Sequence, residues 1–145
     1  MTDTPAAATR DDLGFLLAKA SQRWNERLQE RFAAVGFPEV RASYGSILIP
    51  LFEEDGLRMG ELAARARLSK QTMTTMVRLL ERDGLVERRP DPTDARAARI
   101  FLSGRAREFR PAAESVLGAL EREMIRALGA EATKELRTTL RRLAG

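Results

Sequence analysis

Two short helical segments lie almost end to end in the middle of the chain, and this arrangement restricts the fold more than any other feature. The segment "MGELAARA" (59–66) is followed by "RL" and then by "SKQTMTTMVRLLERD" (69–83). Ser69 is a favourable N-cap, and Gly84 stands where a helix is commonly capped at its C-terminus. Two short helices joined by so tight a turn predict a helix-turn-helix arrangement.

The second segment has an apolar and a polar face when its residues are spaced as in a helix. The apolar side carries Met73, Met76, Val77 and Leu80; the opposite side carries Gln71, Thr75, Arg78 and Arg82, with Lys70 and Thr74 at its margin. A solvated helix usually mixes Glu and Lys, whereas short hydroxyls, an amide and cations are suited to base edges in the major groove of DNA. The alternative is an ordinary amphipathic helix with a threonine-rich outer face.

A strand–loop–strand pattern follows in "GLVERRPDPTDARAARIFLS" (84–103). Leu85-Val86 and Ile100-Phe101-Leu102 predict two short strands around an arginine-rich loop. An arginine at the tip, Arg96, can enter a flanking minor groove, where A·T-rich DNA concentrates negative potential. We expect Asp94 to orient its guanidinium, and Asp91-Pro92 to stiffen the turn. The alternative is an exposed ion pair that contributes only ~0–1 kcal/mol.

Charge is concentrated in the same part of the chain. Residues 65–110 hold 12 Arg or Lys against 6 Asp or Glu, a balance of +6, while the chain as a whole has a net charge of +4. Local positive charge favours an anionic partner such as nucleic acid. The alternative is a general bias toward arginine at the surface, since Arg outnumbers Lys 22 to 3.

The flanking segments are also predicted to be helical. The expected helices are 10–35, capped by Thr9; 42–54, shortened or kinked at Pro50; a long one from Ser103-Gly104 to Gly129, bent at Pro111; and a last one carrying Leu136, Leu140 and Leu143. The predicted fold is mainly α with a small β-hairpin wing. We expect a disordered tail over 1–9 and a single domain over 10–145, with a winged helix-turn-helix core at 42–103 and dimerisation helices at 10–35 and 104–145. The alternative is that these outer helices pack wholly within one subunit.

The composition excludes much chemistry. Cysteine and histidine are both absent, which removes disulfides, thiol nucleophiles and the commonest general base and metal ligand. An enzyme using carboxylates alone, such as Glu53 with Asp55, is the remaining catalytic alternative, but no phosphate loop or spaced metal ligands support it. We therefore predict no enzymatic activity, cofactor or metal. The absence of a signal peptide or an apolar run of ~18 residues predicts a cytoplasmic protein with no membrane partner.

Residues 60–106, "GELAARARLSKQTMTTMVRLLERDGLVERRPDPTDARAARIFLSGRA", resemble the winged-helix core of the MarR family of bacterial transcription regulators. Asp94 and Arg96 match the D-x-R wing signature of that family, whereas Ala95 departs from the second basic residue of many members. The resemblance implies a homodimer that binds palindromic double-stranded DNA, usually as a repressor and often released by a small molecule. The lack of cysteine excludes a thiol-switch member.

The candidate DNA-binding residues are Ser69, Lys70, Gln71, Thr72, Thr74, Thr75, Arg78, Arg88, Arg89, Asp94, Arg96 and Arg99. Ser69 and Lys70 are expected at the helix entry, Arg99 with Arg88 or Arg89 on the DNA backbone, and the others as described above. Arg23, Trp24 and Tyr44 are candidates for lining an effector pocket between the outer helices and the winged unit; the alternative for each is a place in the core or an interface. A rival reading is a winged helix that binds another protein and lacks DNA specificity.

Overall fold

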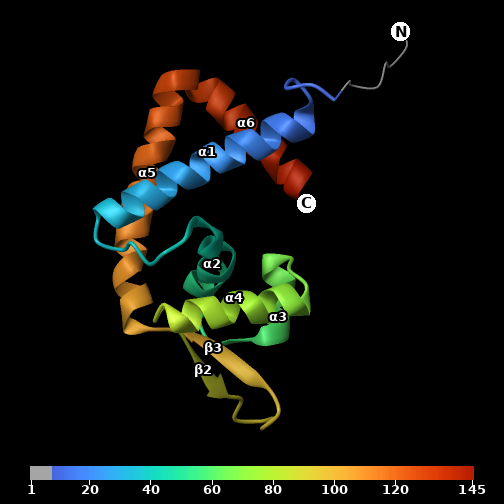
Figure 1. The fold of residues 1–145 in the computed structure, drawn as a ribbon, viewed down its shortest axis with the longest axis vertical. Coiled ribbons are helices and arrows are strands. Elements are labelled where there is room, and N and C mark those ends of the chain that lie inside the picture. Colours follow the sequence, from blue (N-terminus) through green and yellow to red (C-terminus); the bar gives the residue numbers. More distant parts are fainter. Residues whose placement is uncertain (1–7) are drawn as a thin grey trace.

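The computed structural model describes residues 8–145 and is mainly helical, with one small antiparallel sheet (Figure 1). Its elements are α1 (Leu13–Ala34), the 3-10 turn η1 (Ala42–Tyr44), α2 (Gly45–Glu53), β1 (Leu57–Arg58), α3 (Met59–Ala66), α4 (Lys70–Arg82), β2 (Val86–Pro90), β3 (Ala98–Leu102), α5 (Gly104–Leu128) and α6 (Ala130–Ala144). The predicted fold class is confirmed. Most of the predicted N-terminal tail, residues 1–7, lies outside the described residues.

The first helix begins three residues later than predicted. Asp12, not Thr9, is its N-cap, because the Asp12 carboxylate accepts the Phe15 N–H at 3.1 Å. Aspartate is at least as good an N-cap as threonine, so the predicted first-turn acid became the cap itself. The second predicted helix is also divided, into η1 and α2, and both α2 and α5 run through their prolines, Pro50 and Pro111.

The sheet has three strands in the order β1-β3-β2, and β1 was not predicted. In the hairpin, Val86 pairs with Leu102 and Arg89 with Arg99. On the other edge of β3, Leu57 pairs with Ile100. The third strand thereby joins the hairpin to the entry of α3, which begins one residue after β1.

One hydrophobic core connects the winged unit to the outer helices. Its fully buried side chains include Ile47 of α2, Leu62 of α3, Val77 of α4 and Ile100 of β3, each with 0% exposure. The core continues outward through Phe109 of α5, whose ring meets that of Phe32 of α1 edge-on at 4.9 Å between centroids. The start of α5 and the end of α1 are therefore fixed to the winged unit.

The two ends of the molecule differ in composition. Figure 1 shows α1 crossing α5 and α6 at one end, and the β2–β3 hairpin projecting at the other end, beyond α4. Large apolar side chains remain exposed on the N-terminal half of α1, the end of α5 and α6: Leu13, Phe15, Leu16, Leu17, Ile125, Leu128, Leu136, Leu140 and Leu143. Among the described residues, no helix is both long enough and apolar enough to cross a bilayer.

Candidate nucleic-acid interface

The α4 helix is built as the sequence predicts. The Ser69 hydroxyl accepts the Thr72 N–H at 3.1 Å at the start of the helix. At its end Gly84 has a φ of +74°, and the Leu85 N–H reaches back to the Leu80 carbonyl at 2.9 Å. The left-handed Gly84 and the backbone hydrogen bond from Leu85 to Leu80 together form a Schellman cap, which ends the helix sharply.

The predicted faces of α4 are confirmed by burial. Met73, Val77 and Leu80 are buried; on the opposite side Gln71, Thr75, Arg78 and Arg82 are exposed, with Lys70 and Thr72 exposed at the N-terminal end and Thr74 half-buried at the margin. A helix packed on one side in this way presents its other side for contact with a partner.

Two threonines of the outer face have their hydroxyl protons engaged within the helix. Thr74 donates to the Lys70 carbonyl at 2.8 Å and Thr75 donates to the Gln71 carbonyl at 3.1 Å. Each hydroxyl therefore has only its lone pairs left for a partner, next to the threonine methyl group. A methyl group and acceptors suit contact with a thymine methyl and a base amine.

The cations of α4 differ in how they are held. The Arg82 guanidinium donates to the neighbouring Asp83 at 3.2 Å. Arg78, Lys70 and the Gln71 amide make no side-chain hydrogen bond or ion pair with other described residues. These three side chains can be redirected toward a ligand without breaking an internal contact.

The two arginines of β2 are engaged on the protein surface. Arg88 donates to Glu81 of α4 at 3.0 Å. Arg89 donates to Glu87 at 3.0 Å and lies over the Phe101 ring, with its guanidinium carbon 4.3 Å from the ring centroid. Their predicted contacts with phosphate would have to compete with these partners.

Arg96 lies at the tip of the hairpin, and its side chain is 95% exposed. The structure differs from the expectation for Asp94, whose carboxylate accepts the backbone N–H of Arg96 at 3.0 Å but lies 3.7 Å from the Arg96 Nε. The latter distance is an ion pair without a hydrogen bond. Asp94 thus fixes the backbone turn and leaves the guanidinium largely free, because two residues of separation favour the side chain-to-backbone bond.

Arg99, expected on the DNA backbone, points instead to Asp91. Its Nε donates to the Asp91 carboxylate at 3.0 Å, and its Nη1 donates to the Gly56 carbonyl at 3.4 Å. Hydrogen bonds from the Thr93 hydroxyl and N–H hold the pKa of Asp91 well below its usual range, and Arg99 and Arg58 lower it further. The hairpin environment therefore favours the ionised form of Asp91.

Helix and hairpin meet in a cleft of about 600 Å³. It is lined by four of the predicted residues, Lys70, Thr74, Arg88 and Arg96, together with Arg58, Glu61, Met59, Gly60, Ala63, Met73, Ala97 and Ala98. Arg58 and Arg88 are paired with Asp91 and Glu81, so Lys70 and Arg96 supply the cationic groups that an anionic partner would meet in this cleft. Arg58 was missed because β1, which carries it, is too short to give a periodic signal.

Known proteins resemble this chain over the same segments. The MarR family model matches residues 43–98. The regulator TtmR of Methylorubrum extorquens is 38% identical over 61 residues, a match that covers 42% of this chain and 31% of that protein. The repressor Rv2887 of Mycobacterium tuberculosis is 30% identical over 122 residues, which cover 78% of this chain and 88% of that protein.

The chain belongs to the MarR family. Solved structures agree in fold. A probable transcriptional regulator from Pseudomonas aeruginosa has a TM-score of 0.79 at 25% identity, covering 92% of this chain and 97% of the other. The repressor CouR bound to a 23-mer DNA duplex has a TM-score of 0.80 at 22% identity, covering 97% and 100%. PcaV of Streptomyces coelicolor, in complex with its natural ligand, has a TM-score of 0.77 at 21% identity, covering 96% of each.

Membership of the MarR family confirms a transcriptional regulator rather than an enzyme. Among the described residues there is no group of three or more acidic side chains placed to hold a metal ion.

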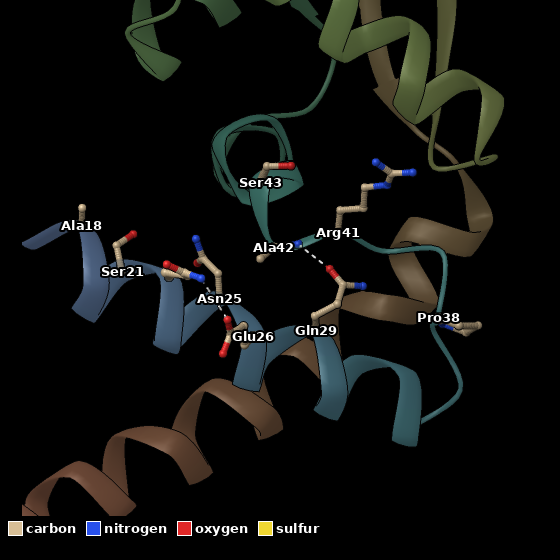
Figure 2. A pocket seen from close by; sticks show the side chains of 10 residues that line it. Ala18, Ser21, Asn25, Glu26, Gln29, Pro38, Arg41, Ala42 and Ser43 are labelled. Carbon is tan, nitrogen blue, oxygen red and sulfur yellow. Dashed lines mark hydrogen bonds between the residues drawn. The ribbon is translucent and has the colours of Figure 1, made fainter.

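A second concavity lies where α1 faces the start of the winged unit. It is an open groove of about 870 Å³ with several polar side chains in its walls, shown in Figure 2. Its walls are Ala18, Ser21, Gln22, Asn25, Glu26 and Gln29 of α1, and Pro38, Arg41, Ala42 and Ser43 opposite them. Gln29 spans the base of the groove, since its amide oxygen accepts the Ala42 N–H at 3.0 Å.

The three predicted pocket residues lie near this groove but do not line it. Arg23 is exposed and lies 3.7 Å from Glu26, in an ion pair. Trp24 is partly buried against the hydrophobic core. Tyr44 is fully buried and donates its hydroxyl to Asp83, and burial together with that carboxylate raises the Tyr44 pKa.

Proposed function

We propose that this protein is a dimeric, sequence-specific DNA-binding repressor of the MarR family that acts in the cytoplasm. In this proposal α4 lies in the major groove with Gln71, Thr72, Thr74, Thr75 and Arg78 toward bases or nearby phosphates. Ser69 and Lys70 lie at the entry, and Arg96 enters the minor groove. Arg88 and Arg89 contact the DNA backbone after exchanging their present carboxylate partners for phosphate.

The observation that carries the proposal is where cations with little or no internal pairing lie on α4 and the hairpin. Most arginines of the described chain are tied to carboxylates or carbonyls, for example Arg105 to Glu39 at 2.6 Å. Lys70 and Arg78 have no such partner among the described residues, and Arg96 has only the pair at 3.7 Å. Lys70 and Arg96 line the cleft between α4 and the hairpin, and Arg78 is exposed on the outer side of α4. Cations in these positions are the ones expected to neutralise phosphate and read bases.

Dimerisation is supported by the apolar surface on α1, α5 and α6. Leu13 is 76% exposed, Leu128 52% and Leu143 65%. Large apolar side chains left exposed on several neighbouring helices are typical of a surface that a partner covers. A second copy would place two α4 helices, one from each subunit, on the two half-sites of a palindrome.

Release by a small molecule is supported by the groove beside α1. A ligand bound between α1 and residues 41–43 would contact both the outer helices and the winged unit, and could change the distance between the two α4 helices of a dimer. PcaV, which shares the fold, was solved with its natural ligand.

The experiment is selection of bound sequences from a random duplex pool, followed by titration of the selected duplex in the presence of a scrambled competitor at physiological salt. We expect a palindromic site that is preferred over scrambled DNA by at least about a thousandfold. Equal binding to both duplexes would favour the rival, a winged helix that binds another protein. Repeating the titration with a panel of small molecules, and following the fluorescence of the single Trp24, tests the effector.

A further inference from the structure

Asp91 is the most completely engaged side chain of the hairpin. Its carboxylate is 0% exposed. The Oδ1 atom accepts the Thr93 N–H at 2.8 Å and the Thr93 hydroxyl at 2.7 Å. The Oδ2 atom accepts the Arg58 Nε at 2.6 Å and the Arg99 Nε at 3.0 Å. One oxygen therefore holds the loop and the other holds two strands.

These contacts join the hairpin to a segment of the chain that lies outside it. Arg58 belongs to β1 and directly precedes α3, and its Nη2 also donates to the Thr93 hydroxyl at 3.1 Å. Arg99 belongs to β3 and reaches the Gly56 carbonyl. The loop of the wing, its second strand and the entry to the helix-turn-helix thus meet at a single carboxylate.

The contacts of Asp94 are confined to the tip of the loop. Its side chain is 46% exposed, and its hydrogen bond is to the backbone two residues away. It shapes the tip of the loop but contacts neither β1 nor α3. An exposed ion pair with Arg96 contributes little to holding the wing against the helices.

We infer that Asp91, rather than Asp94, is the residue that positions the wing against the recognition helix, and that it thereby sets the preference for the sequence flanking the site. Asp91 acts through Arg58 and Arg99 on the placement of Arg96; it is a positioning residue and touches no DNA. The inference rests on the proposed DNA binding. It also gives Arg99 and Arg58 internal roles in place of contacts with phosphate.

The substitution Asp91→Asn tests this with little change of shape. The amide keeps the size of the carboxylate but turns an NH2 group toward either two guanidiniums or the Thr93 N–H, and all of these are donors. The two guanidiniums, held on one oxygen in the parent, then repel each other. The wing should lose its fixed position while α4, with its own cap and buried face, keeps its structure.

The measurement is a double-substitution cycle on two duplexes that share the core site and differ in A·T-rich or G·C-rich flanks. In the parent background, Arg96→Ala is expected to weaken binding to the A·T-flanked duplex by about tenfold. Asp91→Asn alone should give a similar loss. Adding Arg96→Ala to Asp91→Asn should weaken binding by less than about a further twofold, because a displaced Arg96 no longer contacts the flanking DNA. Adding Arg78→Ala to Asp91→Asn should weaken binding by the same factor as Arg78→Ala does in the parent, since α4 is held independently.

Glu114→Gln, an equivalent loss of charge at an exposed acid of α5 that pairs with Arg110, is the matched control and should alter both affinities by less than about twofold. The inference is overturned if Arg96→Ala costs the same factor in both backgrounds, or if Asp94→Asn weakens binding more than Asp91→Asn does. If Asp91→Asn fails to fold by circular dichroism, Arg99→Gln, which removes one of the two guanidiniums, is judged by the same cycle. A parent with no preference for any duplex overturns the proposed function itself, and this inference with it.

Discussion

The hydroxyl of Tyr44 donates a hydrogen bond to the carboxylate of Asp83, joining the turn that precedes α2 to the end of α4. Tyr44 follows directly on Ser43, which lines the groove beside α1, and Asp83 is the C-cap of α4. This bond therefore connects the proposed effector groove with the proposed recognition helix through two adjacent residues.

Tyr44→Phe should lower the free energy of unfolding by about 1–2 kcal/mol at pH 7, because a buried hydroxyl bonded to a carboxylate is lost. The Tyr44 bond lowers the pKa of Asp83, with Arg82 adding to the effect. Its contribution is therefore present above the unfolded carboxyl pKa of about 4 and disappears as the pH falls through the lower folded value. Denaturant titrations of parent and variant from pH 7 to pH 3 should converge; a difference independent of pH would contradict this.

Arg78→Ala should weaken binding to the selected duplex by about 1–3 kcal/mol and relax the preference at one base position. Arg78 is exposed on the outer face of α4 and has no side-chain partner among the described residues. Fluorescence anisotropy with single-base variants of the duplex measures both effects. Arg122→Ala, an exposed arginine of α5, is the control and should bind as the parent does.

Arg96→Ala should weaken binding most at A·T-rich flanks and reduce the slope of log affinity against log salt by about 1. The side chain stands at the tip of the hairpin and is 95% exposed. Mobility shifts at several salt concentrations give the slope. A variant indistinguishable from the parent at every salt concentration would remove the wing from the DNA interface.

Ser69→Ala should destabilise the protein by about 1 kcal/mol, since the Thr72 N–H loses its capping acceptor. Thermal unfolding without DNA measures this apart from any contact with phosphate. Ser69→Asp restores a capping oxygen and should recover most of the stability. If the alanine and aspartate variants unfold at the same temperature, the cap is not what holds the start of α4.

Leu140→Glu should dissociate the dimer. Leu140 is 42% exposed on α6, and burying a leucine contributes about 1.5–3 kcal/mol per copy, so the dissociation constant should rise at least about a hundredfold. Light scattering with size-exclusion chromatography at micromolar protein measures the mass. Ile49→Glu is the control: Ile49 on α2 is 52% exposed and similar in size to leucine, and its substitution should leave the mass unchanged. A monomeric parent would overturn the dimer proposal.

Helix positions could be predicted from the sequence where a cap and a long apolar period occur together. Ser69, Gly84 and Gly129 mark helix ends in both sequence and structure. The prediction that Thr9 caps the first helix was wrong because Asp12, three residues later, offers an equally good cap closer to the first apolar turn. The strand β1 could not be predicted, because its two residues show no alternation and pair with residues far away in the sequence, Ile100 and Arg99.

The candidate site was predictable in its exposed face and less so in its internal charges. The sides of α4 follow from periodicity alone, and burial agrees with them. Residues 70–102 hold seven arginines or lysines and five acids, and the sequence alone does not say which of them pair. Asp94 lies closer to Arg96 in sequence, but Asp91 gains two guanidiniums because pairing of β1 with β3 brings Arg58 and Arg99 to it.

Ser103 makes the connection between the sheet and α5 rigid. Its hydroxyl donates to the Gly84 carbonyl at 2.7 Å and accepts the Ala106 N–H at 3.1 Å. The residue after α4, the end of β3 and the first turn of α5 are thus held together at Ser103. Any rotation of α5 would swing wing and recognition helix as one arm, so that a small displacement near the apolar end would be magnified at the DNA.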